Sequence, residues 1–218
     1  MPKCLHYFPS IPPCRSVLLT AEAVGVELEL KVVDLKEQEH MNPEFLEMNP
    51  QHCIPTLNDE GFIIWESRAI MGYLVEQYGP DDSLYPRDPK RRAIVNQRLF
   101  FDAGILYPRL AAFYYPMMFC DASVDAARLA RLEEAFQFLD IFLGGGDDWV
   151  AGRCLTIADI ALVVSVSTVD ALGFDVNKYS KVAKWYNRCK ATIKGYYELN
   201  QHGALKFREL YDNSTPIK

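Results

Sequence analysis

Short extended stretches and helical patterns alternate in the first third of the chain. Residues 3–8 are mostly apolar and aromatic and predict a strand, which the proline-rich stretch 9–13 ends. Apolar side chains at three- and four-residue spacing from Cys14 predict a helix that stops at Gly25, and residues 27–33 predict a second strand. A strand–helix–strand order of this kind predicts that the two strands are parallel.

The segment that follows carries the signals of a short helix, a hairpin and a longer helix. Residues 43–48 predict the short helix. Residues 55–65 contain two apolar stretches around the turn sequence Asn-Asp-Glu-Gly, which is typical of an antiparallel hairpin. A helix is expected over about 67–78, because Gly79 and a proline follow it.

Beyond Pro89 the strand signal disappears and every pattern is helical. Residues 129–143 have apolar side chains at three- and four-residue spacing, and Thr156 and Asp159 form the capping box of another helix. The expected fold class is therefore α/β plus all-α: a βαβ-α-ββα domain at 1–80, a polar, proline-rich linker at 81–89 and an all-helical domain at 90–218.

Two prolines interrupt the long helical segment after the linker. Pro108 predicts a kink or break near Leu106, and Pro116 predicts an end near Tyr115, because proline removes a helical hydrogen bond and restricts the residue before it.

Composition narrows the classes of function. The chain has 218 residues with a formal net charge of -6, and its 23 Lys and Arg residues are scattered apart from the short cluster Lys90-Arg91-Arg92, which disfavours a nucleic-acid partner. Its most apolar run, residues 160–169, is too short to span a membrane, and we expect no secretory signal at the start. The six cysteines form no C-x-x-C pair and no metal spacing with histidine, so we expect reduced thiols in the cytoplasm and no structural metal.

The tripeptide Glu66-Ser67-Arg68 is the first candidate for binding chemistry, because it lies where a strand passes into a helix. Free amides of a first helical turn and the Ser67 hydroxyl can meet a carboxylate, while Glu66 can receive an ammonium group. Such a site suits a ligand with an amino acid end. The alternative is that Ser67 only caps its helix and the two charges are solvated.

A second candidate is Ile54-Pro55 at the start of a short strand. A cis bond here would turn the Ile54 amide outward to pair with a peptide ligand, whereas an ordinary trans proline at a strand edge would have no such role. His40 and His52 precede this proline and are either ligand contacts or surface loop residues.

The order of these motifs resembles cytosolic glutathione transferases, most closely the insect delta class, over nearly the whole chain. The stretches that carry the resemblance are Pro13-Cys14-Arg15-Ser16-Val17, Glu39-His40, Asn49-Pro50-Gln51-His52-Cys53-Ile54-Pro55-Thr56-Leu57, Trp65-Glu66-Ser67-Arg68-Ala69-Ile70, Asp82-Ser83-Leu84-Tyr85-Pro86 and Leu155-Thr156-Ile157-Ala158-Asp159-Ile160-Ala161.

The resemblance implies a thioredoxin-like N-terminal domain that binds glutathione, a helical domain that helps to bind a small hydrophobic electrophile, a cis Ile54-Pro55 bond and a homodimer. The capping box at Thr156 and Asp159 would serve folding. Carried over by position, the glutathione site would be lined by His40, His52, Cys53, Ile54, Pro55, Glu66, Ser67 and Arg68. The electrophile pocket would be lined by Phe8, Ile11, Pro12, Leu35, Tyr107, Tyr115, Met118, Phe119 and Phe207.

One departure concerns the catalytic hydroxyl. The delta class carries its thiol-activating serine where this chain has Ile11. Two hydroxyls lie nearby: Ser10, one residue earlier, and Tyr7, at the strand end that carries the catalytic tyrosine of the alpha and sigma classes. The sequence predicts Ser10 as the donor to the thiol and leaves Tyr7 as the alternative.

Three functions are compatible with these residues. The first is a transferase that adds the glutathione thiolate to hydrophobic electrophiles. The second is a weakly catalytic or non-catalytic carrier of hydrophobic ligands, suggested by Ile11. The third is a thiol–disulfide reductase that uses Cys14 at a helix N-terminus, although Cys14 has no resolving partner in sequence.

Overall fold

The computed structural model of the chain describes residues 3–213. Its first part is a four-stranded mixed sheet in the order β2-β1-β3-β4, built from β1 (Lys3–Tyr7), β2 (Glu29–Val32), β3 (Thr56–Asp59) and β4 (Phe62–Trp65). The pair β1–β2 is parallel and the hairpin pair β3–β4 is antiparallel, as the sequence predicted. The pair β1–β3 is also antiparallel.

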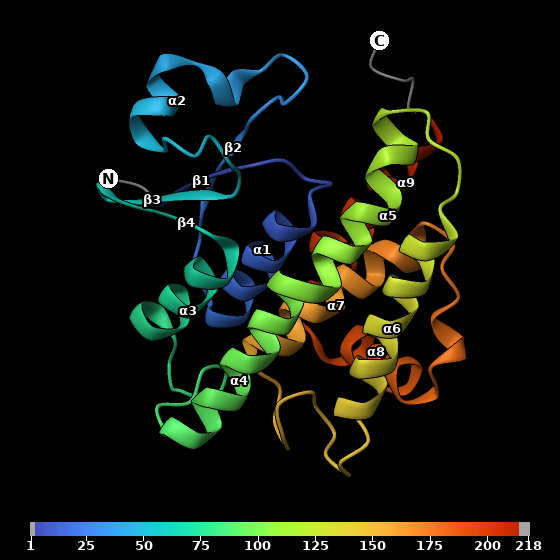
Figure 1. Cartoon of the computed structure of the whole chain (residues 1–218). Helices are drawn as coiled ribbons and strands as arrows, with labels where there is room; N and C mark the ends of the chain where they lie inside the picture. The colour runs from blue at the N-terminus through green and yellow to red at the C-terminus, as the bar shows by residue number, and fades with distance from the viewer. Residues whose placement is uncertain (1–2, 214–218) are drawn as a thin grey trace.

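Helices cover both faces of this sheet (Figure 1). The helices α1 (Pro12–Val24) and α3 (Ser67–Tyr78) pack together on one face, where Leu5 and Leu57 are completely buried. The short α2 (Pro43–Met48) lies on the other face and follows a 3-10 turn at Glu39–Met41. This arrangement is the thioredoxin-like fold that the resemblance implied.

The ends of α1 follow from sequence. The helix begins at Pro12, two residues before the predicted start, because proline lacks only an N–H that the first turn leaves unpaired in any case. It ends at Gly25, which adopts a φ of 75° that glycine accepts without steric cost.

The rest of the described chain is helical. Its elements are α4 (Pro89–Phe101), the π-helical η2 (Asp102–Leu106), α5 (Tyr107–Phe119), α6 (Ala126–Phe142), α7 (Ile157–Ala171), a 3-10 turn at Val176–Lys178, α8 (Ser180–Thr192), the π-helical η4 (Tyr196–Gln201) and α9 (His202–Asp212). The central α7 is buried from Ile157 to Val169 and packs against α1, so the two parts of the molecule share one core.

The predicted capping box is present at the start of α7. Asp159 accepts from the Thr156 amide at 2.9 Å, and its other oxygen accepts from the Val150 amide and the Trp185 indole N–H, each at 2.9 Å. One buried carboxylate therefore fixes three segments of the helical part.

The predicted end near Tyr115 is wrong. The helix α5 passes through Pro116 and continues to Phe119. Proline leaves the carbonyl four residues earlier, that of Ala112, without its helical partner, and the Arg128 side chain of α6 donates to it at 3.3 Å. The interruption predicted near Leu106 is the π-helical segment η2.

No helix within residues 3–213 is long and apolar enough to cross a membrane. Residues 79–88 form no helix or strand, and α4 begins at Pro89. The domain ranges 1–80 and 90–218 with a linker at 81–89 remain an interpretation of this pattern; residues 1–2 and 214–218 of those ranges lie outside the described chain.

Candidate functional site

The first turn joins β1 to α1 and contains both candidate residues of the proline-rich loop. The Ile11 amide donates to the Phe8 carbonyl at 3.1 Å, which closes the turn through Pro9 and Ser10. Ser10 is only 1% exposed, and its hydroxyl has no hydrogen-bond partner among the described residues. Ile11 is half-buried and occupies the N-cap position of α1.

Tyr7, the alternative donor, is half-buried at the end of β1 and packs against the core. Burial, with a smaller contribution from Cys14, raises the pKa of its phenol. The hydroxyl therefore keeps its proton at neutral pH and can donate a hydrogen bond.

Cys14 follows the first turn and is completely buried. Burial raises the pKa of its thiol to about 12, so the thiol stays protonated near neutral pH. All six cysteines are free. These observations speak against a reductase that uses a Cys14 thiolate.

The loop before β3 contains the cis Ile54-Pro55 bond that was predicted. The buried Asn49 holds this loop: its amide donates to the Cys53 carbonyl at 3.1 Å and to the Thr56 hydroxyl at 2.9 Å. Cys53 and Ile54 are half-buried and Pro55 is buried.

The two candidate histidines lie together beside this loop, with ring centroids 6.0 Å apart. The Nδ1 atom of His40 is buried without a partner among the described residues. His52 is exposed and has a φ of 43°, a conformation that costs a non-glycine residue about 1 kcal/mol or more.

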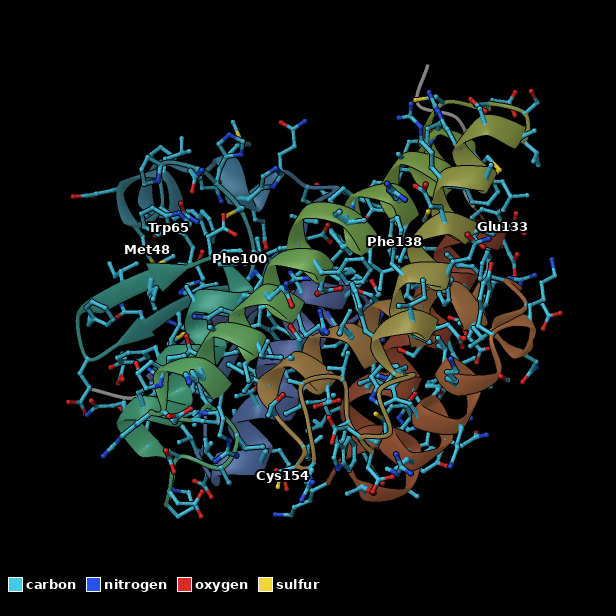
Figure 2. The ribbon with its side chains drawn as sticks, turned by 60° about the horizontal axis from the view of Figure 1, so that its bottom comes forward. Met48, Trp65, Phe100, Glu133, Phe138 and Cys154 are labelled. Carbon is cyan, nitrogen blue, oxygen red and sulfur yellow. The ribbon has the colours of Figure 1, made fainter. Side chains whose placement is uncertain are left out.

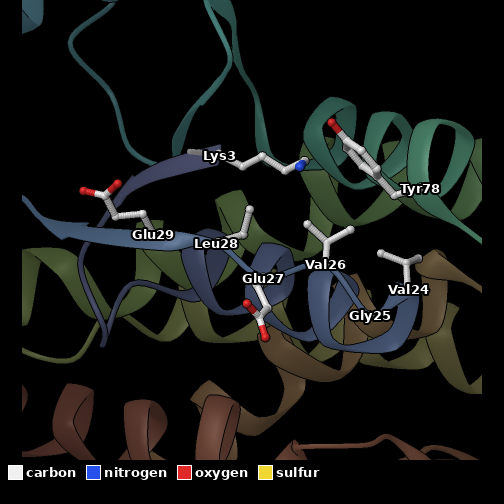
Figure 3. Close-up of a pocket in the computed structure, with 8 residues that line it drawn as sticks. All are labelled: Lys3, Val24, Gly25, Val26, Glu27, Leu28, Glu29 and Tyr78. Atoms are coloured by element: carbon white, nitrogen blue, oxygen red, sulfur yellow. The ribbon is translucent and has the colours of Figure 1, made fainter. Parts of the chain in front are cut away.

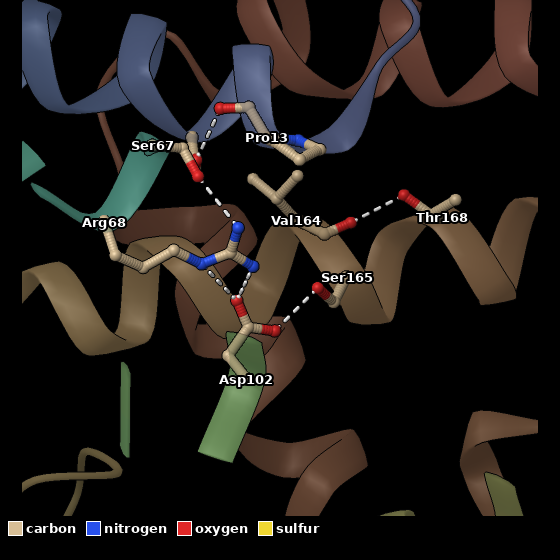
Figure 4. Close-up of polar contacts among 8 residues, drawn as sticks. Pro13, Ser67, Arg68, Asp102, Val164, Ser165 and Thr168 are labelled. Carbon is tan, nitrogen blue, oxygen red and sulfur yellow. Dashed lines mark hydrogen bonds and ion pairs between the residues drawn. The ribbon is translucent and has the colours of Figure 1, made fainter. Parts of the chain in front are cut away.

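Glu66, Ser67 and Arg68 lie at the start of α3. Figure 4 shows Ser67 and Arg68 with their polar contacts. Glu66 is exposed and is the N-cap residue, with a φ of 69°. The alternative that Ser67 caps the helix is wrong, because Ser67 is the first helical residue and its hydroxyl accepts from Arg68 at 2.8 Å.

Arg68 connects this site to the helical part of the molecule. Its guanidinium pairs with Asp102 of η2, and the other oxygen of Asp102 accepts from the Ser165 hydroxyl of α7 at 2.7 Å. The Arg68 guanidinium also lies 5.7 Å from the centre of the Tyr107 ring. Arg68 thus orients Ser67 while α3, η2 and α7 hold it in place.

Four of the predicted electrophile contacts form a chain of aromatic rings on α5 and α9. The Tyr107 and Tyr115 hydroxyls are 2.8 Å apart, and the Tyr115 ring lies 5.8 Å from that of Phe119 and 6.3 Å from that of Phe207. Met118 and Phe207 are only 2% and 3% exposed, so a ligand reaches them only if neighbouring side chains move.

The remaining predicted pocket residues lie nearer the sheet. Phe8, Ile11 and Pro12 belong to the first turn and the start of α1, and Leu35 follows β2; Pro12 is buried and the others are half-buried. Their roles toward an electrophile remain predictions.

Three supporting residues were not singled out from the sequence. Asp102 and Ser165 carry no local motif, because their contacts with Arg68 and with each other arise only in the folded chain. Asn49 lies within the Asn-Pro-Gln-His stretch, and its side chain organises the loop rather than facing a ligand.

A separate pocket of about 680 Å³ opens between the end of α1 and β2 (Figure 3). It is lined by Lys3, Val24, Gly25, Val26, Glu27, Leu28, Glu29 and Tyr78. None of the predicted site residues belongs to it. Within residues 3–213 no group of three or more His, Cys, Asp or Glu side chains could hold a metal ion.

Comparison with known proteins agrees with this architecture. Residues 3–76 match the glutathione S-transferase N-terminal domain and residues 96–192 match the glutathione S-transferase C-terminal domain. The chain is 48% identical over 206 residues to glutathione S-transferase D7 of Anopheles gambiae, covering 94% of each chain.

Solved structures are similar over nearly their full length. A Nilaparvata lugens delta-class glutathione transferase superposes with a TM-score of 0.95 at 50% identity, covering 98% of this chain and 100% of that one. The Bombyx mori glutathione transferase BmGSTD1 gives a TM-score of 0.94 at 44% identity, covering 96% and 98%.

A glutathione-binding thioredoxin-like domain followed by a helical domain defines the class of protein, and the chain belongs to the glutathione S-transferase family. Within that family it is a delta-class insect enzyme.

Proposed function

We propose that this transferase joins the glutathione thiolate to small hydrophobic electrophiles, as detoxification enzymes do. The observation that carries the proposal is the arrangement at the start of α3, where Ser67 is oriented by Arg68 and Glu66 stands exposed beside it. The first-turn amides of α3 and the Ser67 hydroxyl suit the glutamyl carboxylate of glutathione, and Glu66 suits its ammonium group.

The remaining part of glutathione would lie along the loop before β3. The cis Ile54-Pro55 bond lies just before β3, where the Ile54 amide would pair with a peptide ligand, and His40 and His52 lie together beside this loop. The unpartnered Nδ1 of His40 supports this assignment, because a buried polar atom without a partner costs about 1–3 kcal/mol that a ligand can recover.

The thiol would then sit at the first turn. A free thiol with a pKa of about 8.5 is only a few per cent ionised at pH 7, so the site must favour the anion. We propose Ser10 as the donor, with Tyr7 as the alternative. The Ser10 hydroxyl has no hydrogen-bond partner among the described residues and is therefore free to donate to the thiol. Because this hydroxyl is buried, the turn must rotate when glutathione binds before the hydroxyl can reach the sulfur.

The electrophile would lie against the aromatic chain of Tyr107, Tyr115, Phe119 and Phe207. Each buried methylene of such a substrate contributes about 0.8 kcal/mol. A Bombyx mori relative described as diazinon-metabolizing, 36% identical with a TM-score of 0.88, makes a hydrophobic xenobiotic a reasonable first choice of substrate to test. We further propose a cytoplasmic homodimer.

The second candidate function is a glutathione-dependent carrier of hydrophobic ligands. It is favoured by Ile11, which places an apolar, half-buried side chain where the delta class has its thiol-activating serine. Both functions would use the same glutathione site. Only the transferase would convert bound glutathione and electrophile to a conjugate at a rate above the uncatalysed reaction.

Glutathione binding is tested first, by the melting temperature of the chain in millimolar glutathione. We expect a clear rise, because a ligand of the native state stabilises it. Ser67→Ala removes a hydrogen bond at the carboxylate and should weaken binding about tenfold or more.

The matched control is Ser180→Ala, which changes the first residue of α8 instead of α3 and should leave the rise intact. No rise for the unchanged chain, or equal losses in the two variants, would contradict the proposed site.

A further inference from the structure

Gly203 is the second residue of α9 and lies on the buried face of that helix, next to Ala204 and one turn before Phe207. Glycine is less favourable than alanine inside a helix, because it gives up more backbone freedom on folding. The backbone of Gly203 is helical and has no positive φ, so its conformation does not require glycine. The reason for a glycine here lies in what packs against it.

The first turn packs directly against Gly203. A Cβ atom on this residue would lie 2.5 Å from the Pro9 carbonyl oxygen and closer still to the Cδ atom of Arg15. Atoms in a folded protein do not approach one another so closely, because the interior is packed at van der Waals contact. An alanine at this position would therefore displace Pro9, Arg15 or both.

Arg15 is not free to yield. Its side chain is 0% exposed, and its guanidinium donates to the Asn200 carbonyl at 3.1 Å and to the Thr168 hydroxyl. The Arg15 side chain is thus held at one end by α1 and at the other by η4 and α7. The first turn is the neighbour that can move.

The first turn would move together with Ser10. The Pro9 carbonyl that faces Gly203 belongs to the peptide joining Pro9 to Ser10, and the proline ring restricts rotation on its own side. The Ile11 amide donates to the Phe8 carbonyl at 3.1 Å and closes the turn around this peptide. A methyl group at position 203 would push the peptide away from α9, and the Ser10 hydroxyl with it.

We propose that Gly203 is a positioning residue for thiol activation: its missing side chain lets α9 support the first turn where Ser10 can serve the glutathione thiol. The inference rests on the proposed function, in which the thiol lies at this turn. Gly203 itself touches no substrate. Phe207, on the same face of α9, has its ring 6.3 Å from that of Tyr115, so one helix supports both the turn and the proposed electrophile pocket.

The test is Gly203→Ala. The first readout is the thiol pKa of bound glutathione, measured from the ultraviolet absorbance of the thiolate as pH is raised, and the second is the separation of kcat from KM. We expect the thiol pKa to rise by about one unit and kcat to fall about tenfold, because the donor is displaced. KM for glutathione should change less than about twofold, because the residues at the start of α3 are untouched.

Ala204→Gly is the matched control. Ala204 is the next residue of the same buried face and is 0% exposed, so its loss weakens α9 without adding an atom at the turn. The melting temperature should fall by about 2–4 °C, as expected for a glycine inside a helix. The thiol pKa should stay that of the unchanged protein.

A double variant tests whether the effect acts through Ser10. In a chain that already carries Ser10→Ala, adding Gly203→Ala should leave the thiol pKa where Ser10→Ala alone puts it, because no hydroxyl remains to be displaced. Two changes that act through one group are not additive.

A measurement on the unchanged protein covers the case that Gly203→Ala does not fold. S-methylglutathione has no electrophile to contact Phe207, so it reaches α9 only through the first turn. Its binding should slow hydrogen exchange of the amides at 202–210, because fixing the turn also fixes the helix that contacts it. Amides of α8 (Ser180–Thr192) should exchange as before.

Four results would overturn the proposal: an unchanged or lower thiol pKa in folded Gly203→Ala, an equal shift in Ala204→Gly, a shift that persists in the Ser10→Ala chain, or exchange at 202–210 that is the same with and without S-methylglutathione bound. If the unchanged protein fails to bind S-methylglutathione, the proposed glutathione site is wrong, and that outcome is distinct from the other four.

Discussion

At the scale of single residues, Ile11 stands where the delta class has a serine, and the backbone of the first turn still starts α1. The Cys14 amide donates to the Ile11 carbonyl at 3.0 Å, so the helix begins there in spite of the apolar side chain. The Ser10 hydroxyl, one residue earlier, is enclosed by protein. Thiol activation therefore depends on whether the turn can present that hydroxyl or whether Tyr7 replaces it.

Substitutions at these positions identify the donor. Ser10→Ala should raise the bound-thiol pKa and lower kcat/KM toward a chlorinated aromatic about tenfold, which corresponds to about 1.4 kcal/mol of barrier. Tyr7→Phe should leave both quantities nearly unchanged. The measurement is the pH profile of kcat/KM together with the thiolate titration of the binary complex.

The reverse pattern, with no effect of Ser10→Ala and a tenfold loss in Tyr7→Phe, would assign the role to the tyrosine. Ile11→Ser is the informative addition, because it restores the hydroxyl of the delta class at its usual position. If only this variant acquires activity, the carrier function is correct for the natural chain.

Local sequence motifs predicted the site residues that lie close together in the sequence. They did not predict contacts between residues that are far apart in the sequence. Ser67 and Arg68 could be singled out because they begin a helix after a strand. Asp102, which holds Arg68, is 34 residues away, and the acceptors of Arg15 on Thr168 and Asn200 are 153 and 185 residues away. No spacing rule connects such positions before the tertiary fold is known.

At the scale of elements, turn and capping signals predicted the ends of helices and strands better than the positions of prolines did. The hairpin of β3 and β4 and the helix stop at Gly25 follow from backbone preferences that act locally. Pro116 failed as a stop signal because a side chain from another helix, Arg128, replaces part of the lost helical bonding. Tertiary contacts can thus rescue a helix that its own sequence would break.

The capping box of α7 should be a major contributor to stability. Asp159→Ala would leave the Val150 amide, the Thr156 amide and the Trp185 indole N–H without their buried acceptor. We expect a loss of at least about 3 kcal/mol in the free energy of unfolding, measured with urea.

Asp125→Ala is the matched control, because Asp125 is a half-buried N-cap residue that accepts from two backbone amides at the start of α6. Its loss should cost about 1 kcal/mol. Equal costs for the two variants would show that the buried network of Asp159 adds nothing to an ordinary cap.

At the scale of the whole molecule, the fold class followed from the change from mixed strand and helix patterns to helical patterns alone after residue 89. The shared core between α1 and α7 did not, because α7 is buried on every side from Ile157 to Val169 and its sequence therefore does not specify which helix packs against it. A homodimer likewise depends on contacts between exposed surfaces, which the hydrophobic pattern along the chain does not specify.

The predicted homodimer has a candidate contact in Phe100 of α4 (Figure 2), which is 75% exposed. We propose this contact because burying so exposed an aromatic side chain between two chains would be favourable. Phe100→Asp should convert a dimer to a monomer in sedimentation at micromolar concentration, with an unchanged circular dichroism spectrum.

The control is Val124→Asp, which changes an exposed apolar residue in the α5–α6 connection, at the end of the molecule away from α3 and α4 (Figure 1). It should leave the dimer intact. A monomeric natural chain would contradict the prediction directly.

The central claim is that the chain forms a thioether between glutathione and a hydrophobic electrophile. The most direct measurement follows the rate with a chlorinated dinitrobenzene at fixed pH, with product mass and chloride release recorded together. We expect saturable catalysis above the uncatalysed rate, one chloride released per conjugate, and loss of activity in Ser67→Ala but not in Ser180→Ala. A chain that is stabilised by glutathione and yet leaves the rate at its uncatalysed value would contradict the claim.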